Sequence, residues 1–382
     1  MTTRKTLKYR LYRNKNNRHL IRRIEIAAHV WNHSVALTRR YYRRYGKHLG
    51  ANQLKKHITK LKRQRRLAHW KQLDAQAIQD VAERLDRSYQ RFFADPKVGR
   101  PSFKKRKRYT SFTLKQTGWK LLGGNRLRIM GRVYKFAKSR EVEGVVKTVT
   151  IKRDRCGDLW LCFSVIQDVA KPEMRDVTSP LGFDFGLKTF LTSSDGSTYH
   201  APQPFKASLK EMARLQRSLA RKERGSNRRR KARLKVARLH RRIADQRRDW
   251  HFKLAHELCD RAGVLCFEDL SMKGMQALWG RKVGDLGFAG FVQILEHVAG
   301  KRGVRVVKVD RFYPSTKTCS ACGEVSSFGL DVRRWRCEGC GGVHDRDHNA
   351  AVNILREGAS SLGLGDVSRV LDGVPSTAAV AA

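Results

Sequence analysis

Four of the eight cysteines form two closely spaced pairs within the stretch CSACGEVSSFGLDVRRWRCEGCGG. Cys319 and Cys322 make the first pair, Cys337 and Cys340 make the second, and fourteen residues separate the pairs. Each pair can chelate an ion from a tight turn, and four thiolates complete a tetrahedral Zn²⁺ site with no open coordination position. The spacing therefore predicts one zinc ion with a structural role. His344 is a weaker candidate that could replace one of the cysteines.

Carboxylates accompany apolar segments at three places in the second half of the chain. Asp184 stands in GFDFGLK, where the flanking phenylalanines would point to the opposite face of a strand. Glu268 ends the apolar run VLCFE, and Asp345 and Asp347 directly precede HNAAVNIL, whose apolar spacing indicates a helix. A buried acid costs free energy unless something neutralises it. Three such acids could hold two divalent ions, one activating water and the other stabilising the leaving oxygen of a phosphodiester.

Each acid also has an explanation that involves no chemistry. Asp184 could be a turn residue at a strand end, Glu268 could pair with an arginine, and Asp347 could cap a helix N-terminus. Their joint occurrence in a strongly basic chain favours a metal site over three unrelated explanations.

The charge of the chain indicates its class of partner. There are 82 Lys and Arg residues against 34 Asp and Glu, a formal net charge of +48. The partner of such a chain is a polyanion, with nucleic acid as the first candidate and an anionic membrane surface as the second. The membrane is disfavoured because no stretch reaches the roughly 18 apolar residues that a spanning helix needs. The basic start of the chain has no apolar segment of a secretory signal, so a cytoplasmic, nucleoid-associated protein of a prokaryote is expected.

The positive charge is most concentrated between Arg214 and Arg248. This segment holds 16 Lys and Arg residues and two acids, with the positive charge expected all round a helix. Contact with the phosphates of a nucleic acid is the predicted use. The candidate contact residues are Lys188, Arg228, Arg229, Arg230, Lys231, Arg241 and Arg242.

The remaining pattern predicts a multidomain chain of α+β and α/β parts. Strand-like segments in residues 1–16 and 109–170 predict a small β-barrel, and the helical residues 17–108, which end in the basic loop GRPSFKKRKR, are inserted in it. Strands and helices then alternate in residues 178–317 and 342–358, which predicts an α/β domain with a mixed sheet. The cysteine segment, residues 318–341, interrupts that domain. Residues 359–382 are expected to be a disordered tail.

With these residues in view, the chain resembles TnpB, a family of transposon-associated RNA-guided nucleases related to the type V CRISPR effectors. The resemblance rests on GFDFGLK, FEDLS, CSACG, CEGCG and DRDHNAAVNIL, and it extends over residues 5–356. It implies an RNase H-like (RuvC) nuclease domain that contains a zinc ribbon. Asp184, Glu268 and a third acid would bind Mg²⁺ there. The third acid is Asp347 by its Asp-x-Asn-Ala-Ala context, with Asp345 as the alternative.

The resemblance also implies partners and a reaction. A wedge-like barrel and a helical recognition lobe would hold a guide RNA from the transposon end and read a short motif beside the target. The expected function is RNA-guided cleavage of double-stranded DNA with two catalytic Mg²⁺ ions and one structural Zn²⁺. A nuclease-inactive RNA-guided repressor and a strand-joining transposase are the alternatives. The three acids argue against the first, and the lack of an evident Tyr or Ser nucleophile weakens the second.

Overall fold

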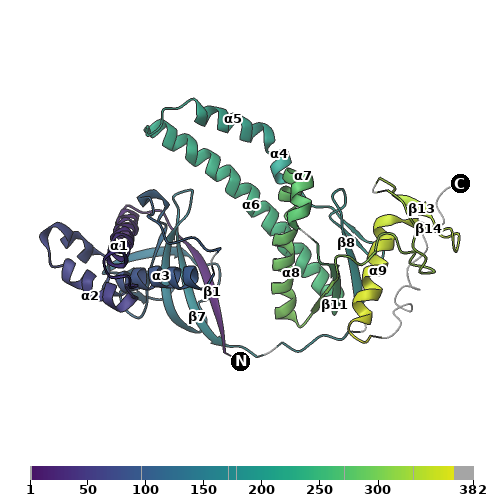
Figure 1. Ribbon diagram of the computed structural model, residues 1–382, viewed down its shortest axis with the longest axis horizontal. Coiled ribbons are helices and arrows are strands. Elements are labelled where there is room, and N and C mark those ends of the chain that lie inside the picture. The colour runs from purple at the N-terminus through teal and green to yellow at the C-terminus, as the bar shows by residue number, and fades with distance from the viewer. Residues whose placement is uncertain are drawn as a thin grey trace. The chain divides into compact units, whose positions relative to one another are not determined.

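The computed structural model describes residues 2–95, 97–170, 172–177, 179–270, 272–329 and 331–364. The chain divides into two compact units, Met1–Ala170 and Lys171–Ala382, which are shown in Figure 1. The predicted tail from residue 365 onward lies outside the described residues. Among the helices that are described, none is long and apolar enough to cross a membrane.

The first unit contains a seven-stranded antiparallel sheet. Its strands are β1 (Thr2–Leu11), β2 (Ser111–Leu114), β3 (Trp119–Leu121), β4 (Arg126–Ile129), β5 (Arg132–Ala137), β6 (Val145–Arg153) and β7 (Leu159–Asp168). The spatial order is β2-β6-β7-β1-β5-β4-β3. Two antiparallel hairpins are present, because β3 pairs with β4 and β6 pairs with β7. The N-terminal strand β1 lies between β7 and β5, so strands from both ends of the unit share one sheet.

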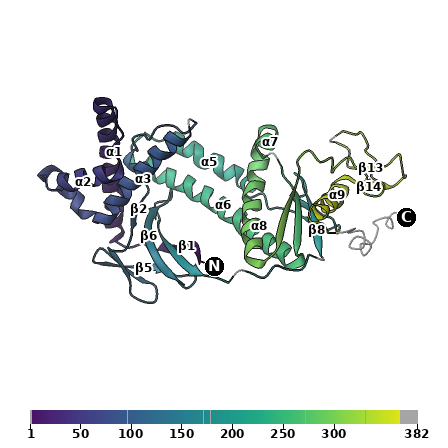
Figure 2. The same ribbon diagram turned by 60° about the horizontal axis from the view of Figure 1, so that its bottom comes forward.

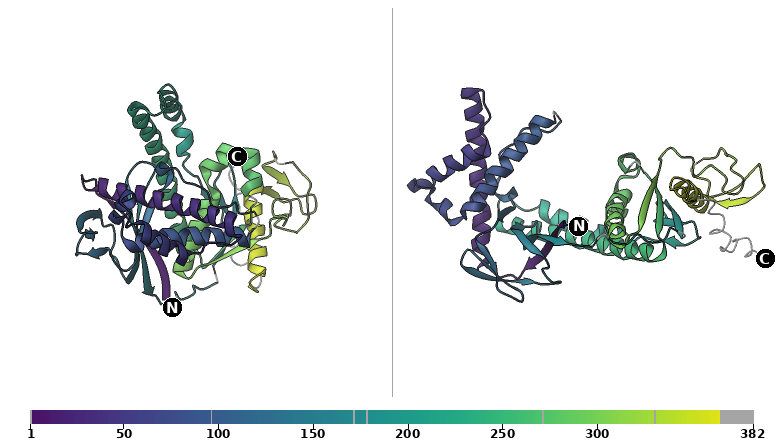
Figure 3. Two further views of the ribbon diagram at one scale, coloured as in Figure 1. Left: turned by 60° about the vertical axis from the view of Figure 1, so that its left-hand side comes forward. Right: turned by 90° about the horizontal axis from the view of Figure 1, so that it is seen from below.

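Helices fill the long connection between β1 and β2. They are α1 (Asn17–Tyr45), α2 (Ala51–Leu61), the 3-10 helix η1 (Arg65–Gln72), α3 (Ala75–Ala94) and the short 3-10 helix η2 (Arg106–Arg108). α1 places apolar side chains such as Leu20 and Ile24 against the sheet, and Asp74 caps α3 by accepting the N–H of Gln76 at 2.8 Å. Figures 2 and 3 show this helical block beside the strands. One core joins the block and the sheet.

The second unit contains a five-stranded mixed sheet, as the sequence predicts. Its strands are β8 (Pro180–Phe185), β9 (Leu191–Ser193), β10 (Thr198–Tyr199), β11 (Val264–Glu268) and β12 (Arg305–Val309), in the order β10-β9-β8-β11-β12. β8, β11 and β12 are parallel, and β9 and β10 are antiparallel additions at one edge. A separate two-stranded ribbon is formed by β13 (Arg334–Arg336) and β14 (Val343–Asp345).

The helices of the second unit lie between and after these strands. They are α4 (Pro204–Ala207), α5 (Leu209–Ala220), α6 (Asn227–Arg261), α7 (Met272–Leu286), α8 (Phe288–Arg302) and α9 (Arg346–Ser360). α6 and α8 pack on the face that carries the aromatic core, whereas α9 lies against the other face along β8 (Figure 1). α9 therefore continues past the predicted start of the tail.

The basic segment differs from its prediction in two ways. It forms two helices, α5 and α6, and Gly225 lies in the turn between them with a φ of 97°. Charge also does not surround α6, because Leu239 and Ile243 are buried with Met212 of α5 in a small apolar cluster. An antiparallel helix pair can bury such a narrow stripe, which the surrounding arginines conceal in the sequence.

A close backbone contact between β8 and α9 holds this helix directly on the sheet of the second unit. A Cβ atom placed on Gly182 would lie 2.2 Å from the carbonyl oxygen of Ala351 and 2.6 Å from the backbone nitrogen of Leu355. Such distances leave no room for a side chain on β8 at this point. Gly358 is similar, since its Cβ would lie 2.5 Å from the sulfur of Cys266 on β11. Two glycines therefore let α9 lie directly on the strands.

Gly182→Ala should force α9 away from β8. We expect a loss of about 2–3 kcal/mol in the free energy of unfolding, because a methyl group would overlap backbone atoms that cannot move independently. Chemical denaturation measures the change. The control is Gly300→Ala, on the open surface of α8, which should stabilise the helix by roughly 0.5–1 kcal/mol. Equal stability of the Gly182→Ala variant and the parent would contradict the close packing.

Candidate active site

Two of the predicted acids stand at the ends of neighbouring parallel strands. The register pairs Phe183 of β8 with Phe267 of β11, and their rings stack at 5.0 Å between centroids on the core face. Because side chains alternate along a strand, Asp184 and Glu268 project toward the face that α9 covers. Both carboxylates are half-buried. The strand pairing therefore places these two acids on neighbouring strands and on the same face of the sheet.

The N-terminus of α9 lies near the end of β8, and it separates the roles of the two aspartates. Asp345 is the helix cap, and one oxygen of its carboxylate accepts the N–H groups of Asp347 and His348 at 3.1 Å each. Asp347 lies in the first turn, and its Oδ2 is 3.9 Å from the position of a Cβ on Gly186, two residues after Asp184. Asp347 thus faces the end of β8, whereas Asp345 is exposed and engaged by the backbone.

Burial disfavours the charged forms of Asp184 and Glu268. Burial, followed by the charges of Asp347 and Glu268, raises the pKa of Asp184 to about 7. The Arg346 guanidinium and the N–H of Phe185 oppose this rise. Burial also raises the pKa of Glu268 to about 7. Keeping both Asp184 and Glu268 charged is therefore unfavourable without an additional cation.

Two arginines contact Asp347, and sequence analysis missed both. Nη1 of Arg333 donates to the two carboxylate oxygens at 3.1 and 3.0 Å, and Arg346 donates to Oδ1 from Nε at 3.2 Å and Nη2 at 3.1 Å. Arg333 precedes β13, so the ribbon supplies a charge to the site. Arginine in the ribbon carries no distinctive sequence signal, because Arg334 and Arg336 follow it at similar spacing.

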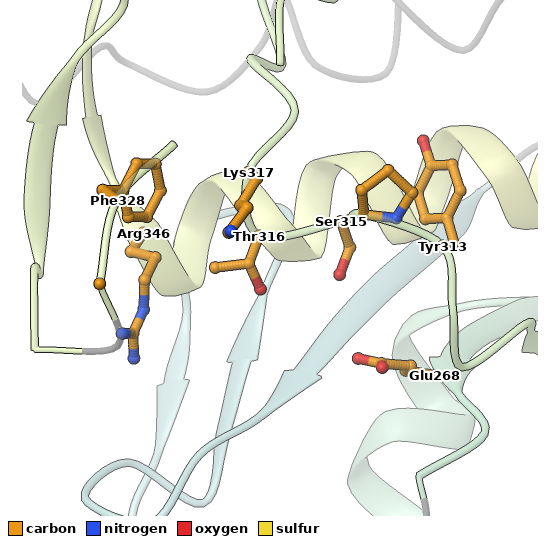
Figure 4. A pocket seen from close by; sticks show the side chains of 9 residues that line it. Glu268, Tyr313, Ser315, Thr316, Lys317, Phe328 and Arg346 are labelled. Carbon is orange, nitrogen blue, oxygen red and sulfur yellow. The ribbon is translucent and has the colours of Figure 1, made fainter. Parts of the chain in front are cut away.

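A pocket of about 250 Å³ opens beside Glu268. Its other walls are the segment from Tyr313 to Lys317, together with Phe328, Gly329 and Arg346. Figure 4 shows the Glu268 carboxylate and the Arg346 guanidinium on opposite sides of this space. An anionic group that entered here would meet a cation, and a cation would meet a carboxylate.

The four predicted cysteines converge in the ribbon. Their sulfur atoms all lie within 4.8 Å of one another, with 3.7 Å between Cys319 and Cys340 and 3.6 Å between Cys322 and Cys337. Four sulfurs arranged tetrahedrally at a zinc–sulfur distance of 2.3 Å are about 3.8 Å apart. The cluster could therefore hold a metal ion such as zinc. His344 places Nε2 at 3.1 Å from the Cys319 sulfur, so it contacts the cluster beside the four thiols.

Both cysteine pairs use the same backbone turn. The N–H of Gly323 donates to the carbonyl of Cys319 at 2.9 Å, and the N–H of Gly341 donates to the carbonyl of Cys337 at 2.9 Å. The two glycines have φ values of 82° and 71°, which other residues rarely adopt. The two sulfurs of each pair are thereby turned toward one point.

Two buried asparagines attach α9 to the segment that enters the ribbon. Asn349 and Asn353 each donate from Nδ2 to the carbonyl of Thr318, at 2.8 and 2.6 Å. Asn353 also donates to the carbonyl of Ser315 at 2.8 Å, and the N–H of Ser320 donates to Oδ1 of Asn349 at 2.8 Å. The helix that carries Asp347 is thus bonded to the chain on both sides of Cys319.

The predicted nucleic-acid contacts lie outside this site. Lys188 is exposed in the turn after β8, and Arg228, Arg230, Lys231 and Arg242 are exposed on α6. Two members of the predicted set are partly buried. Arg229 donates from Nη1 to the carbonyls of Leu219 and Lys222, at 3.1 and 2.5 Å, so it holds the turn between α5 and α6. Arg241 is the other partly buried member.

Comparisons with known proteins find relatives for most of the chain. A family model described as "Probable transposase" matches residues 162–278, and one described as "Cas12f1-like, TNB domain" matches residues 288–354. TnpB-like protein L79 of Acanthamoeba polyphaga mimivirus is 30% identical over 240 residues, 59% of this chain and 46% of that protein. A Streptomyces pristinaespiralis protein described as "Putative RNA-guided DNA endonuclease" is 32% identical over 317 residues, 81% of this chain and 78% of that protein. The chain belongs to the TnpB family.

The matched ranges of this TnpB-family chain include every residue of the candidate site. Asp184 and Glu268 lie in the first range, and the four cysteines and Asp347 lie in the second. A chain of the Cas12f1–sgRNA–target DNA complex has a TM-score of 0.56 at 15% identity, with 92% of this chain and 98% of that one covered. The structural likeness shows a shared mixed α/β fold.

The raised pKa of Asp184 predicts a pH-dependent effect of Asp184→Asn. The folded-state pKa of about 7 lies above the ordinary value of 3.8, so the carboxyl binds a proton more tightly in the folded protein. The free energy of unfolding therefore falls as pH rises from about 4 to 7, because the folded protein must then hold Asp184 in its charged form. Asn cannot ionise and avoids this loss. In metal-free protein, Asp184→Asn should gain roughly 1–3 kcal/mol relative to the parent between pH 5 and pH 8.

Denaturant unfolding in EDTA at the two pH values measures this gain. The matched control is Asp249→Asn, an exposed acid of α6 that pairs with Lys253 at 2.8 Å. Its effect should change little with pH. A pH-independent effect of Asp184→Asn would contradict a buried, uncompensated carboxylate.

The cysteine cluster predicts a separate result. Cys337→Ser should lower the bound metal by about one ion per chain and lower the melting temperature, because three thiolates hold the ion poorly. Elemental analysis of purified protein measures the metal. Cys162→Ser, a half-buried thiol of β7, is the control and should keep the metal content of the parent. Unchanged metal in Cys337→Ser would contradict metal binding by the cluster.

Proposed function

We propose that this protein is an RNA-guided, Mg²⁺-dependent DNA endonuclease of a transposon. The observation that supports the proposal is that, besides burial, the charges of Asp347 and Glu268 both raise the pKa of Asp184, although the three acids belong to three different elements. The relatives are described as RNA-guided DNA endonucleases, and the similar fold belongs to a complex with a guide RNA and target DNA. The substrate is double-stranded DNA that carries a short flanking motif beside the sequence matched by the guide.

The donor set of the site suits Mg²⁺. Hard divalent cations prefer carboxylate oxygens, and burial, which raises the pKa values of Asp184 and Glu268 to about 7, disfavours their charged forms unless a cation binds. Two Mg²⁺ ions held by the three acids would supply an activated water and stabilisation of the leaving oxygen. The protein's own part is to keep the carboxylates in place through β8, β11 and the N-terminus of α9. Arg346 presents a positive charge to an incoming phosphate at the adjacent pocket.

We further propose that the metal of the cysteine cluster is a structural Zn²⁺. The sulfur spacing fits a tetrahedral ion, and all four positions are taken by protein ligands, so none remains for a substrate. The ion would rigidify the ribbon. The hydrogen bonds of Asn349 and Asn353 then fix the position of α9 relative to the ribbon.

Positive charge on the protein binds the nucleic acids, and base pairing with the guide RNA selects the target DNA. The excess of positive charge on the chain supplies phosphate contacts along α6 and in the first unit, where the predicted wedge and recognition lobe would hold the guide RNA. Base pairing between guide and target provides sequence specificity, while the protein reads the short flanking motif.

Asp184→Ala separates cutting from binding. Cleavage of a matched plasmid in Mg²⁺ should fall by several orders of magnitude, on the order of 10³-fold or more, because the acids act as one unit. Binding of guide RNA and target should change little, since lysine and arginine elsewhere contact the phosphates. Plasmid cleavage with a flanking-motif library and filter binding, run in parallel, measure the two effects.

Asp345→Ala is the matched control for the third acid. It removes a helix cap and should cost about 1 kcal/mol of stability, yet it should retain cleavage. Asp347→Ala should behave as Asp184→Ala does. If Asp184→Ala cuts as well as the parent, the endonuclease proposal fails. A parent that binds guided DNA without cutting would be a repressor, and one that joins strands would be a transposase.

A further inference from the structure

The basic loop GRPSFKKRKR, residues 99–108, has no part in the site described above. In the first unit, three side chains of α1 hold it in place. Nε1 of Trp31 donates to the carbonyl of Ser102 at 3.1 Å, and Nη2 of Arg39 donates to the carbonyl of Pro101 at 3.0 Å. Asn32 bonds the backbone of Lys104 in both directions, accepting its N–H at 2.8 Å and donating to its carbonyl at 2.9 Å. The backbone around Lys104 is therefore fixed.

This anchoring places the Lys104 ammonium over an aromatic surface. Nζ lies 3.8 Å from the centroid of the Trp31 ring and 5.6 Å from that of Tyr109. Cation–π contact orients the amine but does not neutralise its charge. Burial and the charge of Arg84 lower the pKa of Lys104. The amine is thus held in a setting that favours an anionic partner.

Four arginines share this setting. Arg84, Arg87, Arg91 and Arg108 line the same pocket of about 340 Å³ as Lys104, together with the hydroxyl-bearing Ser88, Thr110 and Ser111. Of the described residues that line it, none is acidic. The carboxylate of Asp80 pairs with two of these arginines, at 2.6 Å from Nε of Arg84 and 3.9 Å from Nη2 of Arg87. One acid cannot balance five cations in so small a space.

We propose that this pocket binds a phosphate of a nucleic-acid backbone, with Lys104 as its fixed ligand. Positive groups and hydroxyl donors line one pocket, and together they are the donor set that phosphate oxygens require. The aromatic floor can contact the attached sugar or base. The inference rests on the proposed function only in taking nucleic acid as the partner. It assigns the basic loop a built site that is separate from the carboxylates.

The test compares two neighbouring lysines in the full-length protein. Lys104→Met keeps the apolar contact with Trp31 and removes the charge. Lys105→Met removes one charge from a neighbouring position that is also exposed but lies outside the pocket. Affinity is measured over a series of KCl concentrations, with single-stranded RNA in one arm and duplex DNA in the other. Lys104→Met should bind roughly tenfold more weakly than the parent. The slope of log affinity against log salt should fall by about 0.7 for RNA or 0.9 for DNA, as expected for one lost phosphate contact.

Lys105→Met should leave both quantities near those of the parent. The arm in which Lys104→Met acts identifies the strand that occupies the pocket. Equal effects of the two substitutions, or no effect of Lys104→Met in either arm, would overturn the proposal.

Acylation of the parent protein gives a second measurement that needs no variant. Mass spectrometry should find Lys104 protected by bound nucleic acid and Lys105 still modified, and an unprotected Lys104 would also overturn the proposal. Failure here would leave guide-dependent cleavage intact, whereas failure of the endonuclease proposal would appear in the parent's cleavage assay.

Discussion

The second unit depends on direct contact between α9 and the surface of β8. Gly182 leaves no space for a side chain between them, so the helix approaches the strand at backbone distance. This approach brings the acid of α9 to the two acids at the strand ends. Negative charges are thereby placed together where burial already disfavours them, and the pKa of Asp184 rises to about 7. The packing that builds the site also makes it dependent on added positive charge.

The four cysteines influence the position of α9 because the helix is bonded to the chain beside them. Asn349 and Asn353 join α9 to the backbone on both sides of Cys319, and Arg333 at the ribbon reaches the carboxylate of Asp347. Whatever orders the ribbon therefore also orders the first turn of α9. In this account a metal ion in the cysteine cluster supports the carboxylate site from a distance, without taking part in its chemistry.

Local patterns made part of this arrangement predictable from sequence. Paired cysteines followed by glycine form the same turn wherever they occur, and alternation in GFDFGLK places Asp184 opposite the phenylalanines. Asp345 and Asp347 could be ranked only by family resemblance, because either residue can cap a helix. The contact of Arg333 with Asp347 was not predictable, since it depends on how the ribbon folds back over α9. The turn between α5 and α6 was missed because abundant arginine hides the short apolar stripe.

The basic loop of the first unit illustrates the same limit. Its composition indicated only a charged connection, yet contacts with α1 fix its backbone and build a pocket. Such order arises from residues about seventy positions away in the chain, as between Asn32 and Lys104.

The central claim concerns the carboxylates, and anomalous diffraction from crystals grown with Mn²⁺ tests it most directly. The account predicts Mn²⁺ peaks at about 2.0–2.3 Å from oxygens of Asp184, Glu268 and Asp347. No peak there, or a peak coordinated by Asp345 in place of Asp347, would contradict it.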